Sequence, residues 1–198
     1  MSGARGLRQQ LILALVLPAF FVLAGVAYFA DDAMSRALDD ALGDRLTATA
    51  RTGATIVDPK VLLLEPGEDD FRVKKTAEKK LQALATAAAV ERVLVVRLGS
   101  DQVLVDTAGE LQVGAEYVRA GFDRAELDAV ARGESAASVL FEGPDGRRYK
   151  SGYAPLYEEP AEGQERGVVR GAVVVHAPAG FFAALGRVRT VLVVLAII

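Results

Sequence analysis

The sequence contains no cysteine and no tryptophan, and it has a single histidine among its 198 residues. Without cysteine there are no disulfide bonds, thiol nucleophiles, iron–sulfur clusters or cysteine-based zinc sites. One histidine excludes a cluster of histidine ligands, and no glycine-rich phosphate-binding loop or Gly-x-Ser-x-Gly nucleophile motif occurs. The formal net charge of −3 argues against nucleic acid as a partner. We therefore expect no catalytic residues, no metal site and no cofactor in this segment.

Apolar residues are concentrated at the two ends of the chain. Residues 11–30 form a run of 20 residues without a charge, which as a helix would measure roughly 30 Å, the thickness of the hydrocarbon layer of a bilayer. Arg5 and Arg8 precede this run and Asp31 follows it, so the positive-inside rule predicts a cytoplasmic stub at 1–10 and a transmembrane helix at 11–30. The alternative is a cleaved signal peptide, although such peptides usually have an apolar core of only about 7–15 residues.

A second uncharged apolar run begins at Thr190 and continues to Ile198. Nine residues are too few to cross a bilayer, so residues 189–198 are interpreted as the start of a second transmembrane helix that is truncated. The alternative is a short apolar tail that packs on the domain. Between the two runs, residues 31–188 are expected to form one extracytoplasmic domain large enough to bury its own core.

Hydrophobic periodicity predicts the elements of this domain. Met34, Leu38, Leu42 and Leu46 recur every four residues, which indicates a helix over 31–57 that ends before Pro59. Further helices are expected at 71–89, 123–132 and 181–188, and strands at 92–98, 102–107, 137–142, 147–156 and 168–176.

The short turns between these strands favour hairpins. The predicted fold class is therefore α+β, with a five-stranded antiparallel sheet and helices packed against it. Asp123 and Glu126 have the spacing of a capping box at the start of the helix at 123–132.

Three stretches of this domain resemble the Cache family of extracytoplasmic sensor domains, whose fold is PAS-like. The stretches are Val93-Leu94-Val95-Val96-Arg97 to Val103-Leu104-Val105-Asp106-Thr107, Asp145-Gly146-Arg147-Arg148-Tyr149 to Tyr153-Ala154-Pro155-Leu156, and Gly171-Ala172-Val173-Val174-Val175. The resemblance implies the ligand-sensing part of a bacterial transmembrane receptor such as a sensor histidine kinase or a chemoreceptor. It also implies a location in the inner membrane with residues 31–188 in the periplasm.

Candidate ligand-binding residues come from the strand at 147–156. Alternation places Tyr149, Ser151 and Tyr153 on one face, where hydroxyl groups beside aromatic rings suit a small organic acid. Arg97, at the end of its strand, is the candidate for the carboxylate group, and Tyr117 could form a lid. The alternative is that the tyrosines only pack in the core.

Two other polar residues have simpler explanations. Asp106 lies beside a turn, where capping explains it better than metal binding, and His176 is expected to be a satisfied residue of its strand.

The function predicted from the sequence is ligand sensing, in which a ligand-induced helix shift is passed across the bilayer. The predicted recipient of this shift is a histidine kinase of a two-component system. In a homodimer, the membrane helices of one subunit could slide or rotate against those of the other, which would transmit such a shift. The competing hypothesis is a membrane-anchored structural or assembly protein whose periplasmic domain binds a partner protein.

Overall fold

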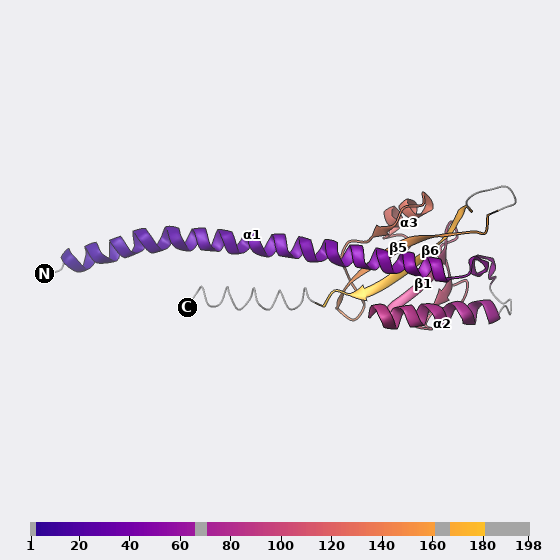
Figure 1. Cartoon of the computed structure of the whole chain (residues 1–198). Coiled ribbons are helices and arrows are strands. Elements are labelled where there is room, and N and C mark those ends of the chain that lie inside the picture. Colours follow the sequence, from indigo (N-terminus) through magenta and orange to yellow (C-terminus); the bar gives the residue numbers. More distant parts are fainter. Residues whose placement is uncertain (1–2, 66–70, 161–166, 181–198) are drawn as a thin grey trace. The chain divides into compact units, whose positions relative to one another are not determined.

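The computed structural model describes residues 3–65, 71–160 and 167–180. Two compact units divide the chain, residues 1–40 and residues 41–198. The elements run in the order α1 (Gly3–Ile56), η1 (Pro59–Leu63), α2 (Phe71–Ala88), β1 (Arg92–Arg97), β2 (Gln102–Asp106), α3 (Arg124–Ala131), β3 (Ala136–Ala137), β4 (Phe141–Glu142), β5 (Arg148–Tyr157) and β6 (Val169–Pro178) (Figure 1). The predicted helix at 181–188 and the predicted membrane segment at 189–198 lie outside the described residues.

The first unit consists of the N-terminal part of α1. Among the described residues, α1 is the one helix that is long and apolar enough to cross a membrane, and a signal sequence would meet the same criteria. Large apolar side chains between residues 15 and 29 are exposed, including Phe21, Leu23 and Phe29. α1 ends at Ile56, next to the predicted boundary, and the Asp58 carboxylate then accepts a hydrogen bond from the Lys60 N–H to begin η1.

In the second unit the strands form one antiparallel sheet in the order β2-β1-β6-β5-β3, and β4 also pairs with β5. The α+β prediction is confirmed. The strand predicted at 137–142 is instead two short strands, because Ala137 pairs with Gly152 whereas Phe141 pairs with Tyr149. Four steps on one chain thus oppose three on β5, and the extra residue makes a bulge that interrupts the strand.

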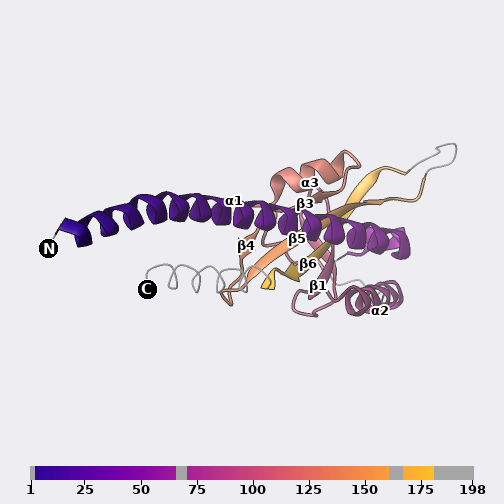
Figure 2. The same ribbon diagram turned by 60° about the vertical axis from the view of Figure 1, so that its left-hand side comes forward.

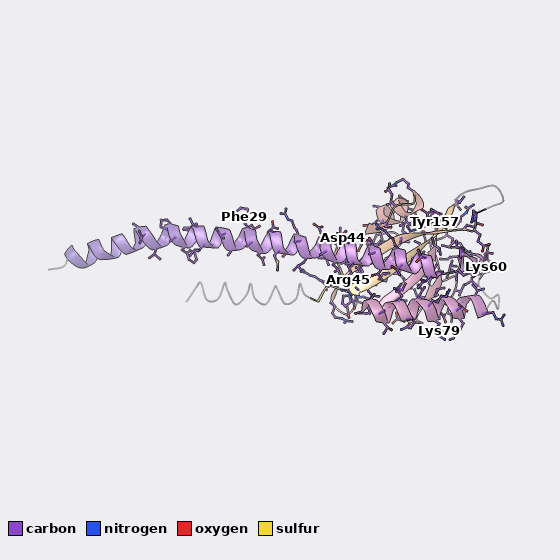
Figure 3. The ribbon with its side chains drawn as sticks, viewed as in Figure 1. Phe29, Asp44, Arg45, Lys60, Lys79 and Tyr157 are labelled. Carbon is purple, nitrogen blue, oxygen red and sulfur yellow. The ribbon has the colours of Figure 1, made fainter. Side chains whose placement is uncertain are left out.

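One face of the sheet is covered by residues 41–56 of α1 together with α2. Leu46 and Ala50 of α1 and Leu81 of α2 are buried there against side chains such as Val173 and Val175 of β6. The side chains of Asp44 and Arg45 are both exposed (Figure 3), and the Arg45 guanidinium donates to the Ala88 carbonyl at the end of α2.

The contact between α1 and β5 is close enough to require glycine. A Cβ atom on Gly152 would lie 2.4 Å from the carbonyl carbon of Leu46 and 2.6 Å from its oxygen. Gly53 makes a similar contact from the helix side, because its Cβ would lie 2.9 Å from Val173 Cγ1 of β6. The backbones of helix and strand therefore meet directly at Gly152, and at Gly53 a side chain of β6 packs directly against the helix backbone.

The other face of the sheet carries α3, which lies on the opposite side from α2 in both views (Figures 1 and 2). A second apolar cluster fills this space and includes Leu94, Val174 and Leu127. The segment between β2 and α3, residues 107–123, crosses the same face and adds Tyr117 and Ala120 to the cluster. Four of the five residues predicted for the site lie on this face: Tyr117, Tyr149, Ser151 and Tyr153.

Candidate functional site

The segment at 107–123 is anchored where it leaves β2. The carboxylate of Asp106, which is buried, accepts hydrogen bonds from the backbone N–H groups of Ala108, Glu110 and Leu111. It also binds the Arg92 guanidinium in a fork, at 2.8 Å to Nε and 2.7 Å to Nη2. Burial acts to raise the pKa of Asp106, but the hydrogen bonds from Arg92 and the backbone outweigh it and leave the pKa below its ordinary value. Turn capping, as predicted from the sequence, therefore explains this residue.

The middle of the segment then pairs with the open edge of β2. Val103 donates its N–H to the Ala115 carbonyl and accepts from the Gly114 N–H, each at 2.8 Å. Gly114 has a φ of +85°, a conformation that L side chains rarely adopt. The Tyr117 N–H donates to the Asp101 carbonyl at 2.8 Å. These bonds fix the backbone of Tyr117 and direct its side chain into the sheet face.

Four side chains meet between this segment and the sheet, three from the segment itself and one from β5. The guanidinium of Arg119 grips the Asp123 carboxylate in a fork, with Nε at 2.8 Å from Oδ2 and Nη2 at 2.7 Å from Oδ1. The Tyr153 hydroxyl of β5 donates to the same Oδ2, the Tyr117 hydroxyl lies 3.4 Å from it, and the two hydroxyls are 3.1 Å apart. We call these four residues the Arg119–Asp123 cluster.

The cluster combines charge with burial. Asp123 is 2% exposed, Tyr117 3% and Tyr153 not at all, whereas the Arg119 side chain keeps 22% of its surface open. Burial, together with the nearby Asp123 carboxylate, raises the pKa of both tyrosines above the ordinary value, so both remain protonated donors. The cluster is therefore a buried anion held by donors, with its cation on the side nearer to solvent.

Ser151, His176 and Phe141 extend the cluster along the sheet. Ser151 Oγ lies 2.7 Å from His176 Nδ1, and the His176 ring is stacked on Tyr117 at 6.2 Å between centroids. Burial, with the positive charges of Arg92 and Arg119, lowers the pKa of His176 to about 4. The imidazole is thus neutral at pH 7, a satisfied residue of its strand as predicted.

Three of the five residues predicted for the site lie together. Tyr117, Ser151 and Tyr153 line the same face and are joined through hydrogen bonds or ring contacts. Tyr149 shares that face, but its hydroxyl lies at the far end of β5, where it is 2.9 Å from a carboxylate oxygen of Asp145 and 3.2 Å from one of Glu91.

Arg97 lies on the opposite face of the sheet from the tyrosines. Its guanidinium donates to the carbonyls of Leu62, at 3.0 Å, and Leu64, at 2.6 Å, and it forms an ion pair with Glu65 at 3.2 Å. Alternation correctly places Arg97 with Val93 and Val95, but alternation within one strand does not say which face it shares with another strand. The structure therefore assigns Arg97 to holding η1 against the sheet.

The arginine and the carboxylate of the cluster were missed by sequence reasoning. The expected capping box at Asp123 is wrong, because its side chain makes no capping hydrogen bond and turns into the cluster instead. The available signal was the four-residue spacing of Arg119 and Asp123 next to Tyr117. Within residues 3–65, 71–160 and 167–180 there is no group of three or more side chains suited to bind a metal ion.

No protein-family model matches the sequence, and no curated protein matches it significantly. Solved structures do match in three dimensions. The ligand-binding domain of chemoreceptor Tlp3 from Campylobacter jejuni superposes with a TM-score of 0.55, at 8% identity over 85% of this chain and 65% of its own. The chain has the fold of a chemoreceptor ligand-binding domain. The ligand-binding domain of Mlp24 gives a TM-score of 0.53, at 11% identity over 84% of this chain and 63% of its own.

The chain therefore spans somewhat less than two thirds of the length of these neighbours. At such low identity the similarity is one of fold. It confirms the architecture that the Cache resemblance implied for the domain.

Proposed function

We propose that this chain is the extracytoplasmic ligand-sensing portion of a bacterial transmembrane receptor, and that it binds a small zwitterion at the Arg119–Asp123 cluster. The observation that carries the proposal is a buried ion pair, capped by two tyrosine hydroxyls, on the sheet face that also holds α3. A sensory site needs charged groups that are already oriented, and this cluster supplies a fork for a carboxylate and an anion for an ammonium group.

The charge balance of the cluster selects the class of ligand. A carboxylate that approaches Arg119 from its exposed side competes with Asp123 for the same fork. If the ligand carried only that charge, it would leave Asp123 buried without a cation, and breaking a buried pair in this way costs about 3–5 kcal/mol. A ligand that also carries an ammonium group replaces the lost cation, so an α-amino acid fits better than the simple organic acid expected from the sequence.

The structural neighbours support this ligand class. The Tlp3 ligand-binding domain was solved in complex with L-valine, its sensory domain with isoleucine bound, and the Mlp24 domain with asparagine. The fold is therefore able to hold an amino acid. In the present chain Tyr117 and Tyr153 are the hydroxyl donors that would complete the hydrogen bonds to a bound zwitterion.

A location in the inner membrane is part of the proposal. The apolar side chains of α1 between residues 15 and 29 are exposed, and exposed apolar surface of that extent is suited to lipid. The charges that flank this run favour the arrangement with residues 31–188 outside the cytoplasm. The output, a histidine kinase or a chemoreceptor signalling domain, and the homodimer belong to the same proposal.

The test is a thermal-unfolding screen of the full chain in detergent micelles, followed by circular dichroism. The probes are the twenty L-amino acids, their α-carboxamides, and acetate and succinate as simple carboxylates. A ligand at a hundred times its Kd stabilises by about 2.7 kcal/mol, which corresponds to roughly 5–11 °C for a domain of this size. We expect at least one amino acid to give such a shift and its carboxamide to give a much smaller one.

Two matched arginine variants locate the site. Arg119→Gln should abolish the shift, whereas Arg97→Gln, on the opposite face, should retain it. The proposed function is refuted if no amino acid shifts the unfolding midpoint, and the proposed site is refuted if Arg119→Gln responds like the wild-type chain.

A further inference from the structure

The ring of Phe141 lies over the guanidinium of Arg119. The Arg119 Cζ atom is 3.3 Å from the centroid of this ring, whereas the exposed ring of Phe122 lies 6.0 Å away. Asp123 holds the guanidinium by its edge, through Nε and Nη2. The guanidinium is therefore held by two partners: Asp123 fixes its rotation within its own plane, and Phe141 fixes the orientation of that plane.

Phe141 reaches this position because of the bulge in the chain between β3 and β4. Ala137 pairs with Gly152, which lies on the face of the sheet that contacts α1. An uninterrupted ladder would pair residue 141 with Arg148 and place it on that same face. The extra residue moves the pairing by one, so Phe141 lies opposite Tyr149 and on the site face. A one-residue irregularity thus directs an aromatic ring to the cluster.

The ring is then held in place by its neighbours. Its centroid is 6.0 Å from that of Tyr149, in a stacked arrangement, and 6.3 Å from that of His176, edge to face. Gly143 closes the turn after β4 by donating its N–H to the Arg147 carbonyl at 2.8 Å. Phe141 is therefore a fixed platform and belongs to the sheet, while Arg119 belongs to the segment between β2 and α3.

We propose that Phe141 is a positioning residue of the site, which holds the Arg119 guanidinium in the plane that its carboxylate partner must share. This inference rests on the proposed function, because the partner is Asp123 in the free protein and the carboxylate of the zwitterion when ligand is bound. The ring makes no contact with the carboxylate itself. It acts through Arg119 by a cation–π contact and by restricting the rotation of a long side chain.

The first experiment measures the exposure of Arg119 without any ligand. The full chain in detergent micelles is treated with phenylglyoxal, and the modification rate of Arg119 is read by peptide mass spectrometry relative to Arg124, whose side chain is 61% exposed. A cation–π contact of ordinary strength corresponds to a change of about two- to thirty-fold in an equilibrium. We expect Phe141→Leu to raise the relative rate of Arg119 by a factor in that range, and Phe141→Tyr to keep it near the wild-type value.

Phe122→Leu is the matched control, because it removes the other ring near the same guanidinium. It should leave the rate unchanged, since that ring lies 6.0 Å away and is exposed. The positioning role is refuted if Phe141→Leu and Phe122→Leu give the same rate. It is equally refuted if modification rises at Arg124 as much as at Arg119, because that would report a general loosening of the fold.

The second experiment measures selectivity, which a purely structural role would not change. For any amino acid that stabilises the wild-type chain, Phe141→Leu should reduce the preference for the acid over its α-carboxamide, and Phe141→Tyr should restore it. A preserved preference in Phe141→Leu contradicts the inference. If no amino acid stabilises the wild-type chain, the proposed ligand class fails, while the phenylglyoxal result still decides whether Phe141 positions Arg119.

Discussion

Replacing Gly152 with alanine tests the direct contact between β5 and α1. The added Cβ atom would lie 2.4 Å from the Leu46 carbonyl carbon, whereas ordinary van der Waals contact begins at 3.4 Å. The opposing atoms belong to the backbone of a buried helix, so relief requires the helix and the strand to separate by about 1 Å. Overpacking of this kind costs about 1–3 kcal/mol.

For a domain of this size that cost corresponds to a decrease of roughly 2–12 °C in the unfolding temperature. The measurement is thermal unfolding of the full chain, followed by circular dichroism. Gly180→Ala serves as the control, because no atom of the described residues lies within 4 Å of the position that its Cβ would take and its φ lies outside the left-handed region. If Gly152→Ala unfolds at the same temperature as Gly180→Ala, the close backbone contact is refuted.

Three other features of the chain give testable expectations. Burial lowers the pKa of His176 to about 4, below its ordinary value of 6.5, so between these two pH values the unfolded chain binds more protons than the folded chain. The free energy of unfolding should therefore decline by up to about 3 kcal/mol as the pH falls through this window. In denaturant titrations, His176→Gln should flatten this decline. Asp106→Asn should lower the free energy of unfolding by about 1.5–3 kcal/mol, because it removes the charged fork that holds the Arg92 guanidinium and leaves it only the ion pair with Glu110, and an unchanged urea midpoint would contradict this. The full chain should remain in the membrane fraction after extraction with alkaline carbonate, and release into the soluble fraction would contradict a transmembrane α1.

The fold could largely be predicted from the sequence because its signals are local. The apolar run, the end of α1 before Pro59, the hairpins and the alternation in β5 each depend on residues close together in the chain. The bulge before Phe141 carried no such signal, because it is defined by pairing with β5, more than ten residues away in places.

The site was predicted only in part for the same reason. Tyr149, Ser151 and Tyr153 follow from alternation along one strand, but the partner of that strand, and hence the position of Arg97, depends on the order of the strands. Asp123 has the sequence context of a helix cap, and only the buried Tyr153 hydroxyl and the fork of Arg119 draw its carboxylate away from the helix. Tertiary contacts decided between two local roles for one residue.

The strand β5 separates the two faces of the domain by the thickness of a single backbone, with Tyr153 in the cluster and Gly152 against α1. If a bound molecule displaces this strand, the free energy that couples the two faces is shared by both. A change that draws α1 closer to the sheet must then alter the ligand affinity of the cluster. The factor is the same as that by which bound ligand alters the equilibrium between the two positions of the helix. Under the proposed function, reciprocity of this kind would let the position of residues 41–56 of α1 tune the affinity for a ligand at the cluster.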